Sequence, residues 1–442
     1  MVKVSTKLIS VIIGMAMLVP IAFATERGGI EEIIEDHDVG GQLRVYNWWT
    51  AGGEKEGIDA AFKVFHSMYP NVVIINAPVS GGAGTSMKQV VMVQVIAGNA
   101  PESFQCHPGY EAYPYHQSNG LDKVNDIWKY AKLEERTPRR LQDMYKIGDD
   151  YYLVPICVHR TNVVWYNKEL FEEYGIEPPA DPVTFKEFWN ICDELQEKLP
   201  KGKYPLALGD RNNWPATQVF ETLMAGISPQ TYEDFINGKV TTSQLEPVLE
   251  AFQKYLSYVP SDHRARTWDE ACGMVYRGDC AMYIHGDWAK GYFTASGWEY
   301  GKQYGTFAAP ETSDWFGLCS DAFAKPRRSV EPDNAIRWLY SYTTVEAQER
   351  FNPLKGSISP YKDVPLDVYD DYSKVAATLL YDPETKFYPS IANGHGSPHE
   401  FVADLNPIIG DFANHPGNIK GTAKSIVKAM GLVGHPKVWD MV

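Results

Sequence analysis

Apolar residues in the first half of the chain alternate between strand-like and helix-like spacing. Residues 43–48 and 72–77 predict strands, the second of them buried, and residues 54–69 between them predict an amphipathic helix. A further helix over residues 85–97 and a short strand over residues 103–106 follow. This βαβ order predicts a mostly parallel sheet covered by helices, with a ligand crevice at the carboxyl ends of its strands.

The second half repeats this style with different details. Residues 153–158 and 162–166 read as strands, and residues 268–276 as a helix. Thr184, with a glutamate three residues later, predicts a capping box at a helix start, and Pro247 is expected to open another helix. The chain therefore predicts two α/β units.

The beginning of the chain predicts an export signal. Residues 1–24 combine a basic start, an apolar run and small residues before an expected cleavage after Ala24, although an uncleaved anchor is the alternative. Residues 25–40 form an acidic extension whose 31–38 segment is expected to be loosely packed. Because no later segment predicts a membrane span, we expect a periplasmic protein with no stable membrane insertion after cleavage.

Charge and cysteine usage narrow the classes of function. The net charge of −15 disfavours nucleic acid or an anionic membrane as a partner, because phosphate binding needs a basic surface. The six cysteines are scattered, and only Cys272 and Cys280 are near enough in sequence to suggest a disulfide, with free thiols favoured. Neither CxxC nor HExxH occurs, so no metal or cofactor is predicted.

Two tryptophan clusters supply the sharpest candidates for binding. Trp48 and Trp49 end the first strand just before Glu54, and adjacent strand residues face opposite sides, so one ring is expected in the core and the other at a ligand. Asp287 and Trp288 place a carboxylate beside a ring, a pairing that suits a sugar because hydroxyl groups need charged acceptors and C–H faces need an apolar plane. The alternative for the second pair is a core tryptophan with a capping aspartate.

Further polar and aromatic residues recur near strand ends, glycine or proline. Each of them alone is also typical of an ordinary loop or surface position. Together they supply donors, acceptors and rings, but no evident pair of nucleophile and base. These candidates are Lys88, Gln105, His107, His159, Trp214, Asp321, Lys355 and His395.

Several motifs resemble a known family. The most specific are YNWW at residues 46–49 and FNPLKGSIS at residues 351–359, supported by FQCHPG at residues 104–109 and LCSDAFAKP at residues 318–326. With these motifs the chain resembles the extracellular solute-binding proteins of ABC sugar importers, and among them the glucose/mannose-binding branch.

The resemblance implies an α/β fold of the periplasmic-binding-protein type II, in which two lobes joined by crossover segments close on a sugar. The implied first lobe comprises residues 41–157 and 308–348, and the second residues 158–307 and 349–442. A monosaccharide and the permease of an ABC importer are the implied partners of a monomer. Glucose is the expected ligand, with mannose and galactose as alternatives.

The same resemblance implies roles for individual residues. Trp48, Trp49, Glu54 and Lys88 would belong to the first-lobe side of the sugar site, and Trp268 and Trp288 to the opposing aromatic wall. The polar residues that would complete the site are Gln105, His107, His159, Asp321, Lys355 and His395. Two other classes remain open: a secreted glycoside hydrolase, since such enzymes also use aromatic clefts with carboxylates, and a binder of amino acids or peptides.

Overall fold

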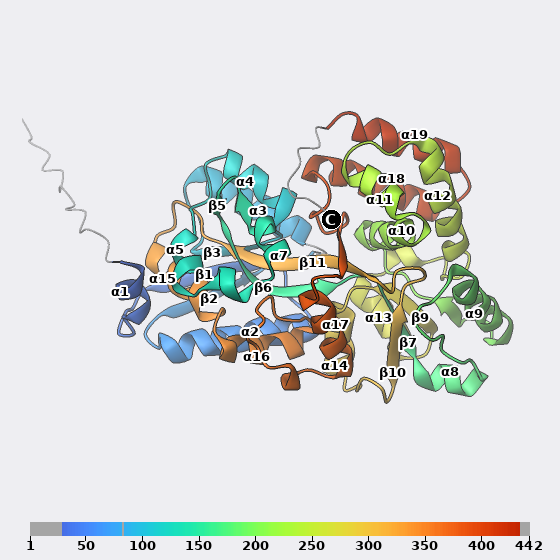
Figure 1. The fold of residues 1–442 in the computed structure, drawn as a ribbon, viewed down its shortest axis with the longest axis horizontal. Coiled ribbons are helices and arrows are strands. Elements are labelled where there is room, and N and C mark those ends of the chain that lie inside the picture. Colours follow the sequence, from blue (N-terminus) through green and yellow to red (C-terminus); the bar gives the residue numbers. More distant parts are fainter. Residues whose placement is uncertain (1–28, 82–83, 434–442) are drawn as a thin grey trace, which may run out of the picture.

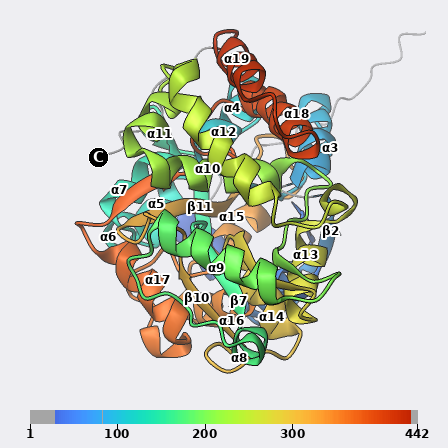
Figure 2. The same ribbon diagram turned by 90° about the vertical axis from the view of Figure 1, so that its right-hand side faces the viewer.

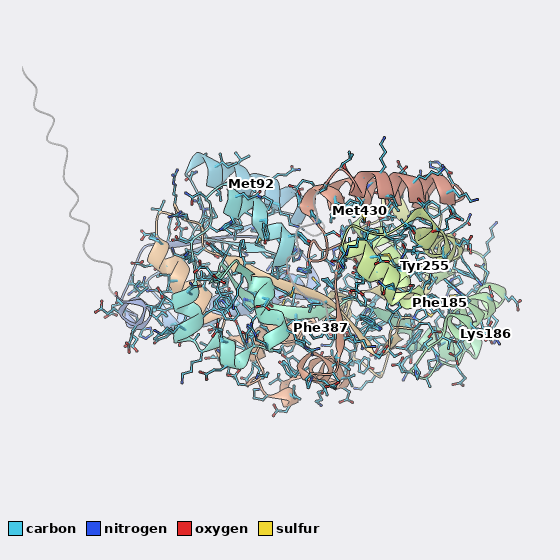
Figure 3. All side chains as sticks on the ribbon, turned by 45° about the horizontal axis from the view of Figure 1, so that its top comes forward. Met92, Phe185, Lys186, Tyr255, Phe387 and Met430 are labelled. Atoms are coloured by element: carbon cyan, nitrogen blue, oxygen red, sulfur yellow. The ribbon has the colours of Figure 1, made fainter. Side chains whose placement is uncertain are left out.

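The computed structural model describes residues 29–81 and 84–433, which form two α/β lobes lying side by side in Figure 1. The expected signal at residues 1–24 and its cleavage point lie outside the described residues. Side chains fill the interior of both lobes in Figure 3, where Met92 lies on the first lobe and Tyr255 and Met430 on the second.

The strands are β1 (Gln42–Asn47), β2 (Val73–Pro78), β3 (Ser103–Cys106), β4 (Lys146–Ile147), β5 (Asp150–Tyr151), β6 (Leu153–Arg160), β7 (Val163–Asn167), β8 (Tyr204–Leu206), β9 (Cys280–His285), β10 (Tyr304–Ala308), β11 (Trp315–Ala324) and β12 (Lys386–Pro389).

The helices of the first half are α1 (Ile30–Glu35), α2 (Gly52–Met68), α3 (Thr85–Ala97), η2 (Gly109–Ala112), α4 (Tyr113–Gln117), α5 (Asn125–Tyr130), α6 (Leu133–Arg136), α7 (Arg139–Gln142), η3 (Asp143–Tyr145), α8 (Lys168–Tyr174), α9 (Phe185–Lys198) and α10 (Trp214–Ile227). Those of the second half are α11 (Pro229–Ile236), α12 (Thr242–Leu256), η4 (His263–Ala265), α13 (Trp268–Tyr276), α14 (Trp288–Ala295), α15 (Pro332–Ser341), α16 (Val345–Lys355), η5 (Leu366–Val368), α17 (Asp371–Tyr381), α18 (His399–Asn414) and α19 (Ile419–Met430).

The sheet of the first lobe is mixed rather than mostly parallel. Its strand order is β12-β11-β3-β1-β2, with β6 also paired to β11. β1 is parallel to β2 and β3, whereas β11 is antiparallel to β3 and β6. The chain leaves this lobe through β6 and returns through β11, so these two crossover strands run in opposite directions.

β2 is not the buried strand that its apolar sequence predicts. It is the last strand in the order of the sheet, and its side chains are mostly exposed, Val73 to 63%. The expectation was wrong because an apolar run does not show whether a strand is central or at an edge.

The second lobe is built on the sheet β10-β7-β9-β8. In Figure 2, which looks onto this lobe, α9, α10, α11 and α12 lie toward the viewer. The capping box of Thr184 at the start of α9 is confirmed. Pro247 does not open its helix, because Thr241 and Gln244 form a capping box that starts α12 earlier and leaves the proline inside it.

The acidic segment near the start of the chain is ordered and packed. It contains α1, whose Ile33 and Ile34 are buried and whose backbone accepts a hydrogen bond from the Tyr69 hydroxyl at 2.8 Å. The expectation of a loosely packed extension was wrong because two adjacent isoleucines lie among its acidic residues and bury against α15 and α5.

Three connections join the lobes: β6 to β7, β10 to β11, and the segment from β12 to α18. The second-lobe start expected at residue 349 falls inside α16, and this helix packs against α2 of the first lobe. All six cysteines are buried free thiols, including Cys272 and Cys280. Among the described residues, none of the helices is both long enough and apolar enough to cross a membrane.

Candidate functional site

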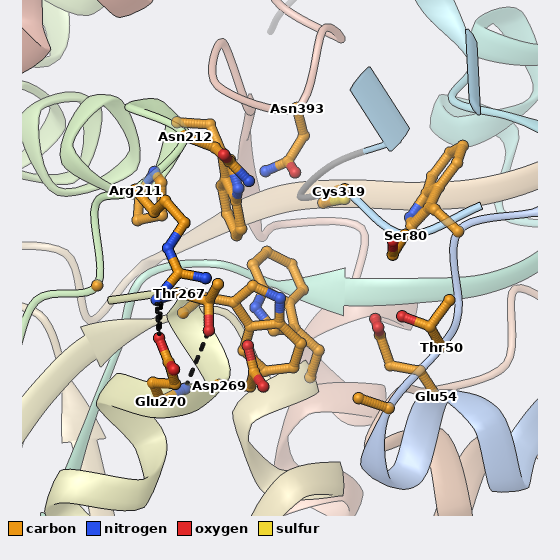
Figure 4. A pocket seen from close by; sticks show the side chains of 18 of the residues that line it. Thr50, Glu54, Ser80, Arg211, Asn212, Thr267, Asp269, Glu270, Cys319 and Asn393 are labelled. Carbon is orange, nitrogen blue, oxygen red and sulfur yellow. Dashed lines mark hydrogen bonds and ion pairs between the residues drawn. The ribbon is translucent and has the colours of Figure 1, made fainter. Parts of the chain in front are cut away.

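A cavity of about 470 Å³ lies between the lobes, at the strand ends where the crevice was expected. Figure 4 shows Thr50 and Glu54 of the first lobe on one side of it and Arg211 and Glu270 of the second lobe on the other. Of the fourteen candidate residues, those that line the cavity are Trp48, Glu54, His107, Trp214, Trp268, Trp288, Asp321 and Lys355.

Three tryptophans form the second-lobe wall of the cavity. Trp214, Trp268 and Trp288 are the first residues of α10, α13 and α14, so each indole stands where a helix begins. Their rings surround His285 at the end of β9, with ring centroids 5.4, 5.8 and 5.1 Å from the imidazole. Aromatic planes arranged in this way offer stacking surfaces to a ring-shaped ligand.

The first-lobe wall is provided by Trp48. Its neighbour Trp49 is buried in the core against Phe323 and Phe351, so one indole faces the core and the other the cavity, as strand alternation predicts. Gly84 lies against the Trp48 ring, where an added Cβ would come within 2.3 Å of the indole. The glycine is therefore needed for the position of this ring.

Glu54, which is partly buried, and Lys355, which is fully buried, form an ion pair at the cavity. The Lys355 ammonium donates to Glu54 Oε1 at 3.0 Å and lies 3.1 Å from His159 Nε2. Burial raises the pKa of the Glu54 carboxyl against the opposing charge of Lys355. Burial would lower the pKa of Lys355, but Glu54 and Asp321 outweigh it and raise the pKa, so the lysine stays charged.

Asp321 is a carboxylate of the cavity lining that contacts several polar side chains. Its Oδ1 accepts a hydrogen bond from Gln105 Nε2 at 2.8 Å and lies 3.3 Å from His107 Nε2, while its Oδ2 lies 3.5 Å from His159 Nε2. Burial alone would raise the pKa of Asp321, but the two histidines hold it well below its usual range. The carboxylate is therefore ionised and already hydrogen-bonded without a ligand.

A chain of ion pairs and hydrogen bonds continues from His107 through Glu111 to Lys88, away from the cavity. His107 Nδ1 lies 2.9 Å from Glu111 Oε2, which also pairs with Lys88 at 2.6 Å. Lys88 and His107 lower the pKa of Glu111 to about 2 although burial opposes them, and Glu111 raises the pKa of His107 although burial lowers it. Anionic and cationic groups thus alternate from Lys88 to Asp321, which balances the charge of the buried chain.

Asp287 does not line the cavity. It is fully buried, its Oδ1 bonds to His159 Nδ1, and its Oδ2 accepts from Arg160 N at 3.0 Å and from the Tyr372 hydroxyl at 3.3 Å. Burial and Lys355 would lower the pKa of His159, but Asp287 raises it well above its ordinary value. The carboxylate beside Trp288 therefore binds the crossover strand β6 and does not face the cavity.

Five other candidates also lie outside the cavity lining. Trp49 is in the core, and His159 and Gln105 lie behind Lys355 and Asp321, Gln105 also accepting from Trp48 N at 3.1 Å. Lys88 lines a neighbouring cavity. His395 is buried between Pro108 O and Ser320 N, and burial lowers its pKa to about 3.

Comparison with known proteins identifies the family. Residues 49–349 match the profile of the bacterial extracellular solute-binding proteins. The chain belongs to this family.

Relatives and solved structures agree with this assignment. The solute-binding protein is 45% identical to an uncharacterised ABC transporter extracellular-binding protein of Pyrococcus horikoshii, over 88% of this chain and 87% of that one. It is 28% identical to a probable sugar-binding periplasmic protein of Rhizobium meliloti, over 80% and 85% of the two chains. A bacterial solute receptor with a preference for β-D-galactopyranose superposes with a TM-score of 0.75 at 18% identity, covering 88% of this chain and 98% of that one. The two-lobe α/β fold is confirmed.

Among the described residues of the solute-binding protein, two buried groups each bring three potential metal ligands together. In the group of His107, Cys319 and His395, both nitrogens of each imidazole already bond to protein atoms. In the group of Cys157, His159 and Asp321, the Lys355 ammonium lies 3.1 Å from the imidazole nitrogen that a metal would need. Neither group is arranged to bind a cation.

Sequence reasoning missed several polar residues of the cavity. Arg211 and Asn212 come from the turn between β8 and α10, and Asn393 from the segment between β12 and α18. Asp269 and Glu270 belong to the first turn of α13, and Arg211 pairs with Glu270 at 3.2 Å. The run of polar residues directly before Trp214 was the signal that could have pointed to the first two.

Proposed function

We propose that this chain is the periplasmic sugar-binding component of an ABC importer. It binds a monosaccharide in the cavity between the lobes and delivers it to the membrane permease. Glucose is the proposed ligand, with mannose and galactose as alternatives, and the protein acts as a monomer without altering the sugar. The name of the Rhizobium relative and the motifs of the glucose/mannose-binding branch support a sugar as the ligand class.

The observation that carries the proposal is the division of the cavity into aromatic and charged surfaces. Three indoles from the second lobe and Trp48 from the first can pack on the C–H faces of a pyranose. Glu54 supplies a charged acceptor and Lys355 a charged donor between these planes, where hydroxyl groups would lie. Because Glu54 is paired with Lys355, Asp321 with His107 and Glu270 with Arg211, the cavity suits an uncharged ligand.

The energetics are sufficient for a small sugar. A hexose has about 12 heavy atoms, and small ligands gain about −0.3 to −1.5 kcal/mol of binding free energy per heavy atom. Micromolar affinity corresponds to about −8 kcal/mol, which lies within the range that a hexose can reach. Hydrogen bonds to charged groups, at about 1.5 to 3 kcal/mol each, would dominate. Stacking on the indoles, at about 0.5 to 1.5 kcal/mol, would fix the orientation of the ring.

Delivery to a permease needs a protein that signals its loaded state. A sugar that contacts Trp48 and Glu54 of the first lobe as well as the second-lobe indoles would favour the form in which the lobes are closed. The crossover strands β6 and β11 are the segments about which such a hinge motion would occur.

Titration calorimetry tests the proposal directly. The mature protein is titrated with D-glucose, D-mannose, D-galactose and D-xylose, with L-leucine and a dipeptide representing the amino acid and peptide class. We expect micromolar or tighter binding of at least one hexose, and no binding of L-leucine or the dipeptide. Trp288→Ala should weaken that binding at least tenfold, whereas Trp189→Ala, on a helix away from the cavity, should leave it unchanged. Absence of binding to all the sugars refutes the proposal.

A glycoside hydrolase is the competing function, and one observation favours it. A glycosidase needs one protonated and one ionised carboxyl group, and the pKa of Glu54 is raised while that of Asp321 is lowered. Against it, both oxygens of Asp321 are engaged by protein donors and its side chain is only 4% exposed. Chromatography of cellobiose and maltose after long incubation decides, because a binding protein returns both disaccharides unchanged.

A further inference from the structure

The turn that follows β12 is anchored to both lobes and brings Asn393 to the cavity. Tyr232 of α11 donates to Pro389 O at 2.6 Å, on the second-lobe side. His395, at the other end of the turn, bonds to Pro108 O at 2.8 Å on the first-lobe side. Between these anchors Asn393 lines the cavity, and Figure 4 shows its side chain descending from the turn toward the cavity.

Glu221 lies beneath this turn as a fully buried carboxylate. Its Oε1 accepts the Ser390 hydroxyl at 2.6 Å, and its Oε2 accepts Ile391 N at 2.6 Å and Ala392 N at 2.9 Å. Glu221 is seven residues after Trp214 on α10, close to two full turns, so the helix presents both residues on the same side. One helix therefore positions an indole of the cavity wall and the support of the neighbouring turn.

The Ser390 hydroxyl links Glu221 to Asn393, because its donation to Glu221 leaves it able only to accept hydrogen bonds from Asn393. A hydroxyl has one proton and two lone pairs, and the proton of Ser390 is donated to the carboxylate. Its lone pairs receive Asn393 N at 3.2 Å and Asn393 Nδ2 at 2.8 Å. Because an acceptor can face only the NH₂ group of an amide, the Nδ2 of Asn393 must point to Ser390, which leaves Oδ1 for the cavity.

We propose that Glu221, acting through Ser390, fixes the orientation of the Asn393 amide so that the cavity presents a carbonyl oxygen there and selects a ligand hydroxyl that donates a hydrogen bond. Glu221 and Ser390 are positioning residues, and Asn393 is the residue that meets the ligand. The inference rests on the proposed function, because the donor it selects is a sugar hydroxyl.

The surroundings of Glu221 supply a pH signature. Burial raises the pKa of Glu221 to about 7, although Ser390, Ala392 and Ile391 oppose it. The titratable groups that face it are Tyr232 of α11 and Tyr388 of β12, and burial raises the pKa of both, so neither ionises near neutral pH. A protonated Glu221 can donate to Ser390, which frees the serine proton for Asn393 Oδ1 and turns the amide. Affinity for the sugar is therefore expected to fall as the pH drops through about 7.

Calorimetry on whole-protein variants tests the relay with the best-binding hexose of the panel above. Ser390→Ala and Asn393→Ala should each weaken binding about tenfold, and the double variant should be no weaker than the worse single variant, because both remove the same contact. Glu221→Gln should lose a similar factor, since an amide offers a single acceptor oxygen to three donors. The change in affinity between pH about 6 and about 8 should disappear in Ser390→Ala, where the link from Glu221 is cut.

Tyr232→Phe is the matched control, because it removes another anchor of the same turn and leaves the hydrogen bonds of Ser390 to Glu221 and Asn393 in place. It should lower the melting temperature and leave the affinity within about twofold of wild type. Monodeoxyfluoro analogues of the hexose, whose C–F bond cannot donate, add a direct readout. One of them should bind about tenfold more weakly than the hexose to wild type but not to Asn393→Ala.

The outcomes separate the relay from the proposed function. If wild type binds a hexose and Ser390→Ala binds it equally well, or if Tyr232→Phe loses as much affinity as Ser390→Ala, the relay is refuted and the sugar-binding function stands. If wild type binds none of the sugars, both are refuted together.

Discussion

Lys355→Met tests whether the cavity depends on a paired buried charge. The methionine keeps the length and apolar stem of the lysine but leaves Glu54 without its cation. At 3.0 Å and an effective dielectric constant of about 20, two unit charges attract by about 5 kcal/mol, and removal of one partner from a buried pair costs about 3 to 5 kcal/mol. Because the pKa of Glu54 is already raised, this carboxyl can take up a proton, so we expect a loss of about 3 kcal/mol near neutral pH.

Urea unfolding measures this loss of stability. Two further variants, a double variant and an exposed control, test its cause. The double variant Lys355→Met/Glu54→Gln should recover most of the stability, since no charge is left unpaired, yet it should still bind sugar at least tenfold more weakly. Lys55→Met removes an exposed partner of Asp59 on the same helix α2 and should cost less than about 0.5 kcal/mol.

The stability of Lys355→Met should also depend on pH in a defined direction. In Lys355→Met the unpaired Glu54 has a folded-state pKa above its unfolded value, so the stability of this variant falls as pH rises through that folded pKa. The double variant should show no such added slope. A cost below about 1 kcal/mol for Lys355→Met, or a double variant no more stable than the single one, would refute the reasoning.

Three further predictions concern the wall, the second lobe and the thiols. Trp268→Ala should weaken binding of the best hexose about tenfold in calorimetry while circular dichroism stays unchanged, because the indole lines the cavity and is only partly buried where it packs against the core. Burial raises the pKa of Asp210 to about 7, so its contribution to stability is present at low pH and lost as pH rises through about 7. Asp210→Asn should therefore be about 2 kcal/mol more stable than wild type at pH about 8, but not at pH about 4, in urea unfolding. Thiol titration of the denatured, unreduced protein should detect Cys272 and Cys280 with the other four cysteines, and a reductant should not change the melting temperature.

The secondary structure near the site was well predicted because local signals determine it. The helices predicted over residues 85–97 and 268–276 have the bounds of α3 and α13, and Gly98 and Thr267 cap them. The errors fall where distant parts of the chain decide. The exposure of β2 depends on its place in the sheet, and the direction of β11 depends on the return of the chain from the second lobe.

The candidate site was predictable as a set of residue types, but not as a set of contacts. Asp287 and Asp321 are both aspartates at strand ends or in crossover strands, and nothing in the local sequence distinguishes a ligand-facing carboxylate from a supporting one. The register of β6 against β11 sets Asp321 opposite Cys157, with its side chain toward the cavity, while Asp287 reaches the back of His159. The same limit hid Asn393, because its orientation is fixed by Glu221, which is 172 residues earlier in the numbering. Residues that meet the ligand and residues that hold them are chemically alike, and only tertiary pairing assigns the two roles.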